Sequence, residues 1–314
     1  MKHYKIAVIP GDGIGKEVVP EGLRVLEQIG SLFDFRLSFQ SFDWNCDLYK
    51  RTGEMIPEDG LNRLRDHDAI FFGAVGWPDV PDHISLWGLL IPIRREFDQY
   101  VSLRSVRLMP GIVPPVRGYR AGDIDFWVVR ENSEGEYSLI GERQFAGTDG
   151  EVVIQLAVFT RRGTDRILRY AFDLASILKR KHVTSATKSN GIFQSMTFRD
   201  ERFAVIRNEY PAVTADQYHI DIFAARCVLS PSQFSVIVLS NLFGDILSDL
   251  GPGVTGAIAI APSGEINRER IYPSMFEPVH GSAPDIAGGG IANPIGQIWS
   301  AALMSDRLGE PEAG

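Results

Sequence analysis

The sequence contains only two cysteines, Cys46 and Cys227, and they lie far apart in the chain. Two such cysteines provide neither a disulfide framework nor a CxxC metal or redox motif. Long hydrophobic runs are also missing, since no apolar stretch approaches the roughly 18 residues that a membrane-spanning helix needs. The first residues lack the charged region and apolar core of a signal peptide. We therefore expect a soluble protein of a reducing compartment, the cytoplasm.

The chain also has no excess of basic residues. The chain has 32 Lys and Arg against 40 Asp and Glu, which gives a net charge of −8. This charge argues against nucleic acid or an anionic membrane as the main partner. The 314 residues, 44% of them hydrophobic, are enough for one large or two ordinary domains. Because no flexible linker is found, we expect any division into domains to arise where the chain crosses between them.

Apolar runs and helical periodicities alternate along the chain, which is typical of a parallel sheet covered by helices. The pattern predicts strands at 5–9, 33–39, 69–72, 124–129, 183–186, near 213 and at 234–239. It predicts helices at 16–29, 57–65, 164–178, after 190 and at 241–250. Residues 148–150 are expected to form the tip of a hairpin.

The stretch from Asn241 to Pro252 carries two aspartates at helical spacing, and its helix should end at the Gly251-Pro252 pair. Asp245 and Asp249 stand four residues apart, so their carboxylates lie on one face of the helix. A divalent cation between them removes their repulsion, and oxygen ligands suit Mg²⁺ or Mn²⁺. A solvated acidic face is the alternative. The residues available for the buried side are Leu242, Ile246, Leu247 and Leu250.

Two further residues fit a metal-assisted reaction. Asp221, at the start of another predicted helix, would complete a three-carboxylate cation site, although alone it suits a helix cap or the surface. Lys188 follows a buried strand. A lysine there is usually exposed, but beside a cation its pKa would fall and it would act as a base.

Three arginines are candidates for binding a diacid. Arg94 and Arg104 bracket one segment, and Arg130 ends a predicted strand. The carboxyl end of a strand is where α/β proteins place ligand-binding groups, and arginine binds carboxylates in a bidentate manner. Ordinary ion pairing at the surface is the alternative for each one. The opening loop Gly11–Gly15 matches neither GxGxxG nor a Walker A motif, so a tight turn without a ligand is favoured on its spacing alone.

Taken in order, several motifs resemble the isopropylmalate and isocitrate dehydrogenase family of β-decarboxylating dehydrogenases, and most closely its tartrate and D-malate dehydrogenase branch. The motifs are Pro10–Gly15, Leu86–Gly88, Arg94–Arg104, Arg130–Tyr137, Lys188, Asn241–Pro252 and Glu277–Pro294. The resemblance covers nearly the whole chain. It implies an α/β, two-domain isopropylmalate-dehydrogenase-like fold with a continuous mixed sheet and a non-Rossmann cofactor site. Residues 1–99 and 252–314 would bind the cofactor, and 100–251 would dimerise and bind substrate and metal, with a hairpin arm near 139–159.

The resemblance also implies a role for each matching residue. Asp245 and Asp249, with the partner subunit's Asp221, would hold Mg²⁺ or Mn²⁺, and the partner subunit's Lys188 would take the hydroxyl proton of a 2-hydroxy acid. Tyr137 would supply a proton to the enol carbon, while Arg94, Arg104 and Arg130 would bind the substrate carboxylates. NAD is implied as the cofactor because Asp285, at the position that accepts from the ribose hydroxyls, would repel a 2′-phosphate. The other implied cofactor contacts are Ile14, His280, Gly281, Ser282, Ala283 and Asn293. A homodimer with shared sites would follow.

The sequence departs from the family pattern at a few places. The usual Asn-Leu-Arg-Pro appears as Ser102–Ser105, and Gly264-Glu265 replaces a less charged pair that we expect in a loop near the cofactor. The chain also stops where relatives continue through further helices, which would leave apolar surface exposed. Trp87 favours a small diacid by filling the space of a branched chain, whereas Leu89 keeps the region apolar. The alternatives are therefore a 3-isopropylmalate dehydrogenase, or a silent or truncated paralogue acting as a dimer partner.

Overall fold

The computed structural model of the chain describes residues 2–314 and shows two compact units. Unit 1 comprises the chain up to Ser105 and again from Ala257 onward, and unit 2 comprises Val106–Gly256. The chain therefore leaves unit 1 once and returns to it. The roles assigned from the sequence, cofactor binding in 1–99 and 252–314 and dimerisation in 100–251, stay predictions.

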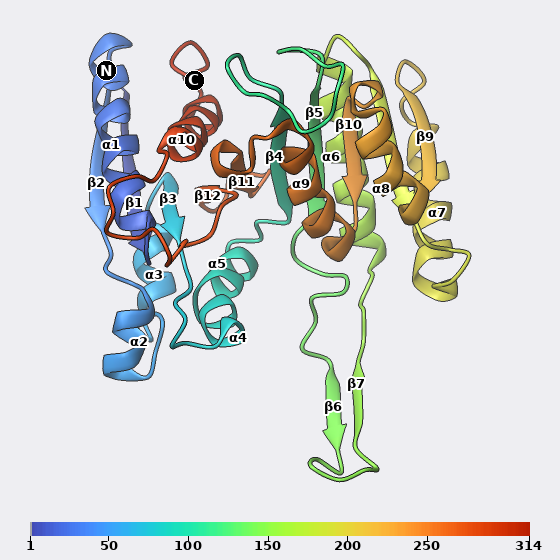
Figure 1. Cartoon of the computed structure of the whole chain (residues 1–314), viewed down its shortest axis with the longest axis horizontal. Helices are drawn as coiled ribbons and strands as arrows, with labels where there is room; N and C mark the ends of the chain where they lie inside the picture. The colour runs from blue at the N-terminus through green and yellow to red at the C-terminus, as the bar shows by residue number, and fades with distance from the viewer. Residues whose placement is uncertain (1) are drawn as a thin grey trace. The chain divides into compact units, whose positions relative to one another are not determined.

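Unit 1 contains a mixed sheet in the order β2-β1-β3-β12-β11-β4 (Figure 1). Its strands are β1 (Lys2–Gly11), β2 (Phe35–Ser41), β3 (Ala69–Ala74), β4 (Val101–Arg107), β11 (Pro262–Ile266) and β12 (Ser274–Pro278). β1, β2, β3 and β12 pair in parallel, whereas β11 runs antiparallel to both of its neighbours. Its helices are α1 (Gly15–Leu32), α2 (Cys46–Thr52), α3 (Gly60–Arg65), α4 (Asp82–Ser85), α5 (Ile91–Glu96) and α10 (Ile295–Leu308).

Unit 2 contains four parallel strands in the order β5-β10-β8-β9. They are β5 (Asp125–Glu131), β8 (His182–Thr187), β9 (Thr214–His219) and β10 (Val236–Leu239). The helices of unit 2 are α6 (Arg161–Ile177), α7 (Phe193–Arg207), α8 (Ile220–Leu229) and α9 (Asn241–Thr255). The central strand β10 is completely buried, which explains its unbroken apolar sequence.

An antiparallel hairpin, β6 (Gly141–Gln144) and β7 (Val152–Gln155), projects from unit 2 as an extended arm (Figure 1). All eight of its strand residues are exposed. Its large exposed apolar side chains include Leu139, Ile140, Phe145, Val153 and Ile154. A two-stranded ribbon is marginally stable alone, and exposed apolar surface of this kind is typical of an interface.

Some sequence-based boundaries were wrong. Phe33 caps the end of α1, so β2 begins only at Phe35. Helix α9 continues through Pro252 and ends at Gly256, whose positive φ of 72° stops it. A proline this close to the helix end removes one hydrogen bond, and tertiary contact outweighs that loss. Ile246 is 57% exposed, so it does not belong to the buried face of α9.

No helix among residues 2–314 is long and apolar enough to cross a membrane.

Candidate active site

The parallel strands of unit 2 bring several predicted site residues to one edge of the sheet. Arg130 lies near the carboxyl end of β5, Lys188 directly follows β8, and Asp221 follows β9. α9, which carries Asp245, begins just after β10. Because the carboxyl ends of parallel strands meet at the same edge, that edge is the expected place for a ligand site.

Arg130, Tyr137 and Asp245 form one cluster. The guanidinium of Arg130 donates to Asn241 Oδ1 through Nε (3.0 Å) and Nη2 (2.7 Å), and Nη1 pairs with Asp245 Oδ1. The Tyr137 hydroxyl donates to the other oxygen, Asp245 Oδ2, at 2.5 Å. Gly244 allows this approach, because a Cβ there would come within 2.6 Å of the Arg130 side chain. The Asp245 carboxylate therefore binds both the Arg130 guanidinium and the Tyr137 hydroxyl.

Glu136 attaches the Tyr137 segment to the first turn of α9. Its carboxylate accepts from the Ser240 hydroxyl at 2.8 Å and from the Leu242 amide at 3.0 Å. Ser240, the N-cap residue, makes no side-chain cap of its own, so Glu136 supplies both the cap and a negative charge at the helix N-terminus. We did not predict this role, because the bonded residues are 104 and 106 positions apart and no local pattern marks them.

Glu131 stabilises the turn that leads to Tyr137. Its buried carboxylate accepts from the amide and hydroxyl of Ser133 and from the amide of Glu134. Burial raises the pKa of Glu131 to about 7, although these hydrogen bonds act in the opposite direction. The folded protein therefore holds a proton on Glu131 that the unfolded chain loses near pH 4.5.

Glu131 should thus make the stability of the protein depend on pH. Its contribution is fully present below pH 4.5 and is lost as the pH rises to about 7. The loss amounts to about 3 kcal/mol by proton linkage. Urea unfolding at pH 5 to 8 should show a flatter pH dependence for Glu131→Gln than for the wild type. An identical slope in both proteins would contradict the assignment, and Glu201→Gln, at an exposed position, serves as the control.

Lys188 and Asp221 form a separate pair, with Lys188 Nζ 3.2 Å from Asp221 Oδ1. The hydrogen bond from Lys188 lowers the pKa of Asp221 below its usual value. Within residues 2–314, no three His, Cys, Asp or Glu side chains are grouped as a metal site. Asp245 is half-buried and Asp249 is exposed on α9, so this chain supplies two of the three predicted carboxylates from one helix, and their donor type fits Mg²⁺ or Mn²⁺. A third carboxylate would have to come from elsewhere.

Arg94 and Arg104, the two predicted substrate-binding arginines that lie in unit 1, are both buried. Arg94 Nη2 donates to Glu277 Oε1 at 2.7 Å and lies 3.6 Å from Glu265 Oε1. The loop expected at Gly264-Glu265 is wrong, because both residues lie within the buried strand β11. They were misplaced because a strand buried on both faces shows no alternation, and a glutamate in it looks like a loop residue.

The two segments assigned to the cofactor lie together in unit 1. The Ile14 amide donates to the Ser282 carbonyl at 2.9 Å, and Gly13 is required there because a Cβ would collide with that carbonyl. Glu17 accepts from the amides of Gly288 (2.6 Å) and Gly290 (3.0 Å). A cavity of about 390 Å³ opens beside them, lined by residues including Asp12, Lys16, Trp77 and Ala287. The charged residues in its lining are three carboxylates, Asp12, Glu17 and Asp47, and one cation, Lys16.

The remaining predicted cofactor residues differ in their surroundings. Asp285 and Gly281 are exposed, Ala283 has a positive φ of 41°, and His280 Nδ1 lies 3.0 Å from the Gly281 carbonyl. Burial lowers the pKa of His280, which favours the neutral ring. Asn293 Oδ1 accepts from the Ile295 amide at 3.0 Å and so helps to begin α10.

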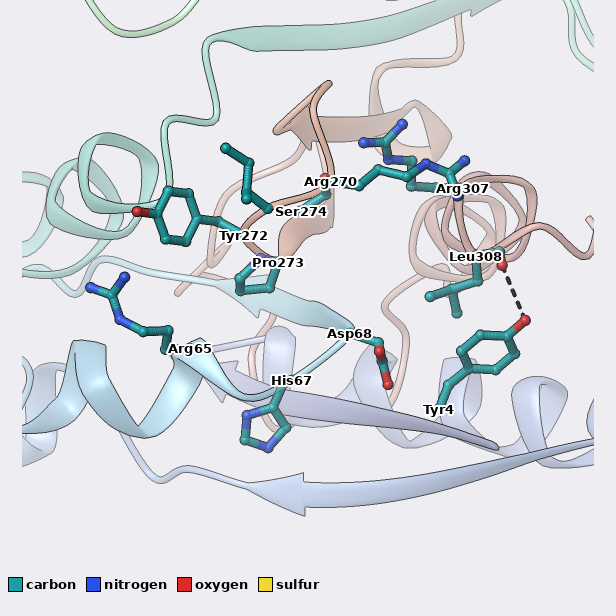
Figure 2. A pocket seen from close by; sticks show the side chains of 11 residues that line it. Tyr4, Arg65, His67, Asp68, Arg270, Tyr272, Pro273, Ser274, Arg307 and Leu308 are labelled. Atoms are coloured by element: carbon teal, nitrogen blue, oxygen red, sulfur yellow. Dashed lines mark hydrogen bonds between the residues drawn. The ribbon is translucent and has the colours of Figure 1, made fainter. Parts of the chain in front are cut away.

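A second cavity of unit 1, of about 220 Å³, includes none of the predicted site residues (Figure 2). Its lining includes Arg65, His67, Asp68 and Arg307. Figure 2 shows Arg65 and Arg307 on opposite sides of it, and the Arg65 guanidinium is engaged by Glu96 and the Tyr272 ring. Arg307 is likewise bound, by the carbonyls of Asn267 and Arg268, so we assign no ligand to this cavity.

Comparison with known proteins agrees with these motifs. A family model described as isocitrate/isopropylmalate dehydrogenase matches residues 5–314. The chain is 60% identical over 311 residues to D-malate dehydrogenase [decarboxylating] of Escherichia coli (strain K12), covering 98% of this chain and 86% of the relative. It is 59% identical over 310 residues to tartrate dehydrogenase/decarboxylase of Pseudomonas putida, covering 98% and 85%.

Among solved structures, a crystal structure of isocitrate dehydrogenase from Methylococcus capsulatus matches with a TM-score of 0.87 and 33% identity. The match covers 99% of this chain and 87% of that one. The α/β fold expected from the sequence is thereby confirmed.

Proposed function

This chain belongs to the isocitrate/isopropylmalate dehydrogenase family, and we propose that it oxidises and decarboxylates a small malate-type 2-hydroxy diacid, D-malate or tartrate. NAD would accept the hydride, and Mg²⁺ or Mn²⁺ would assist. The observation that carries the proposal is the cluster in which Asp245 binds both Arg130 and Tyr137. A metal-type carboxylate, a carboxylate-binding arginine and a proton donor are what this reaction needs at one point.

We propose the following roles for the residues of the chain. Asp245 and Asp249, with the partner subunit's Asp221, would hold the cation, which when bound polarises the hydroxyl oxygen of the substrate. Arg94, Arg104 and Arg130 would bind the substrate carboxylates and fix their orientation. The partner subunit's Lys188 would remove the hydroxyl proton. Tyr137, whose hydroxyl already points at Asp245, would return a proton to carbon after carbon dioxide leaves.

A homodimer with shared sites is part of this proposal. Lys188 pairs with Asp221 in the structure, and Asp245 pairs with Arg130 and Tyr137. Two half-sites on one chain are consistent with each being completed by a neighbouring subunit. The apolar hairpin arm supports the same arrangement, since burial against a second subunit would remove its side chains from water.

NAD binding is proposed where the glycine loop meets the segment after β12, at the hydrogen bond from the Ile14 amide to the Ser282 carbonyl. Ile14, His280, Gly281, Ser282, Ala283 and Asn293 are the residues proposed to surround the nucleotide. Asp285 is proposed to accept from the adenosine ribose and so to disfavour a 2′-phosphate.

The choice of diacid rests on the segment before Arg94. Leu89 is completely buried in the core of unit 1, so packing accounts for its apolar character. Trp87 is only partly buried, and the Arg95 guanidinium lies 4.8 Å from its ring centroid. A large ring held in this way favours a small diacid as the substrate and disfavours 3-isopropylmalate with its branched chain.

A parallel assay tests the proposal. Purified protein with NAD and Mn²⁺ should reduce NAD, read at 340 nm, with D-malate or tartrate, and at least about tenfold less well with 3-isopropylmalate or isocitrate, as a lost pocket contact predicts. A preference for 3-isopropylmalate would replace the proposed substrate. A folded dimer that turns over none of the four would indicate a silent paralogue.

A further inference from the structure

A buried charge cluster in unit 1 surrounds two of the proposed substrate-binding arginines. Strand register places Arg104, Ser263 and Glu277 in one row across β4, β11 and β12. The next row on the same face contains Ser102 and Glu265, because residues two apart on a strand share a face. Arg94 reaches this face from α5 and contacts both glutamates.

Glu265 is completely buried, but its carboxylate has several polar partners within the protein. The hydroxyls of Ser102 (3.1 Å) and Ser263 (2.9 Å) both donate to its Oε1 atom, which also faces Arg94 Nη2 at 3.6 Å. A buried carboxylate persists only where such partners compensate for lost water. The two serine hydroxyls and Arg94 therefore take the place of the water that burial removes from Glu265.

The charges of the cluster balance when all four groups are ionised. Arg94 and Arg104 contribute two positive charges, and Glu265 and Glu277 contribute two negative ones. Burial, the largest effect, raises the pKa of Glu277; Arg94 opposes it, and the charge of Glu265 adds to it. α10, which also packs on β11 and β12, has only Asp306 and Arg307 as charged residues, and Arg307 is bound by the carbonyls of Asn267 and Arg268.

We propose that Glu265 weakens the attraction of Arg94 and Arg104 for a diacid by cancelling part of their charge. The inference rests on the proposed function, since it takes these arginines as the substrate-binding groups. The electrostatic attraction between a dianionic substrate and the cluster is weaker when the cluster is neutral than when it is positively charged. Glu265 therefore limits affinity for small diacids, and diacid binding tightens as the pH falls and Glu277, whose pKa is raised by burial, takes up a proton.

Replacing Glu265 by glutamine tests the proposal with little change in shape. The glutamine carbonyl still accepts from both serine hydroxyls, but the negative charge is gone. We expect the KM for D-malate at pH 8 to fall about tenfold with little change in kcat. The rise of KM with pH should move to lower pH, because Glu265 no longer raises the pKa of Glu277. A purely structural role would raise KM or lower stability.

Calorimetric titration of D-malate into the Mn²⁺-loaded protein, alongside turnover, separates the two proposals. Glu58→Gln, at an exposed position of unit 1, is the charge-matched control and should behave as the wild type. If Glu265→Gln does not fold, Glu265→Ala, which also removes the negative charge, should lower KM in the same direction. Unchanged or raised KM in an active protein overturns the role of Glu265 alone. Failure of the wild type to bind or turn over any diacid overturns the proposed function with it.

Discussion

Replacing Lys188 by methionine should lower kcat by about a thousandfold, because a positioned general base contributes about 10²- to 10⁴-fold to the rate. Methionine keeps the length and much of the volume of lysine but cannot accept or donate a proton. The pairing with Asp221 would also be lost, so the pKa of Asp221 should return toward its usual value. The measurement is NADH formation at saturating D-malate, NAD and Mn²⁺.

The matched control is Lys181→Met, since Lys181 is exposed and lies just before the same strand. It should retain wild-type turnover. A Lys188→Met protein with more than a tenth of wild-type kcat would contradict the assignment of Lys188 as the base. The oligomeric state of both variants, from sedimentation, shows whether any loss arises from assembly.

Replacing Asp245 by asparagine should have an effect of similar size for a different reason. The side chain keeps its shape, but one of the two oxygens that bind Arg130 and Tyr137 becomes an amide nitrogen. The cation also loses a charged ligand. We expect kcat/KM to fall by about a thousandfold and the Mn²⁺ concentration for half-activity to rise. A variant that needs no more Mn²⁺ than the wild type would show that Asp245 is not a ligand. Asp66→Asn, at an exposed position, is the control.

Mixing the two inactive variants tests whether the site is shared. In a mixed dimer, one site would combine the intact Asp245 of one chain with the intact Lys188 of the other. Random reassociation should restore about a quarter of wild-type activity, because half of the dimers are mixed and each has one complete site. No recovery from a reassociated mixture would place Lys188 and Asp245 of the same chain in one site.

Local patterns predicted most of the fold because each element carries its own signal. The buried strand β10 is a continuous apolar run, and α6 keeps the spacing of an amphipathic helix. The predicted end of α9 at Pro252 was wrong because packing decided it, and packing is not local. The strand position of Glu265 was missed for a related reason. Ser263 is close in the sequence, but the other two partners, Ser102 and Arg94, lie more than 160 residues away, so the sequence near Glu265 does not show the positive charge that faces it.

The site residues also differ in whether local sequence patterns mark them. The aspartates, Lys188 and the arginines were predicted as site residues because their residue types and spacing suit a metal-assisted reaction, and the family resemblance added their roles. Glu131 and Glu136 were present in a recognised motif without an assigned role. Their bonds to a turn and to the first turn of α9 depend on tertiary structure. Groups that support reactive residues are harder to predict than the reactive residues themselves, since many residue types can fill such a role.

The pairing of Asp245 with Arg130 has a consequence for how the protein is made. A carboxylate intended for a cation would normally repel its neighbours until the cation arrives. Here Arg130 supplies the opposite charge from within the same unit. A newly synthesised chain can therefore complete this part of its structure in a cell poor in manganese or magnesium. The supply of metal would then limit the fraction of the protein that is active, and it would not limit the amount of folded protein.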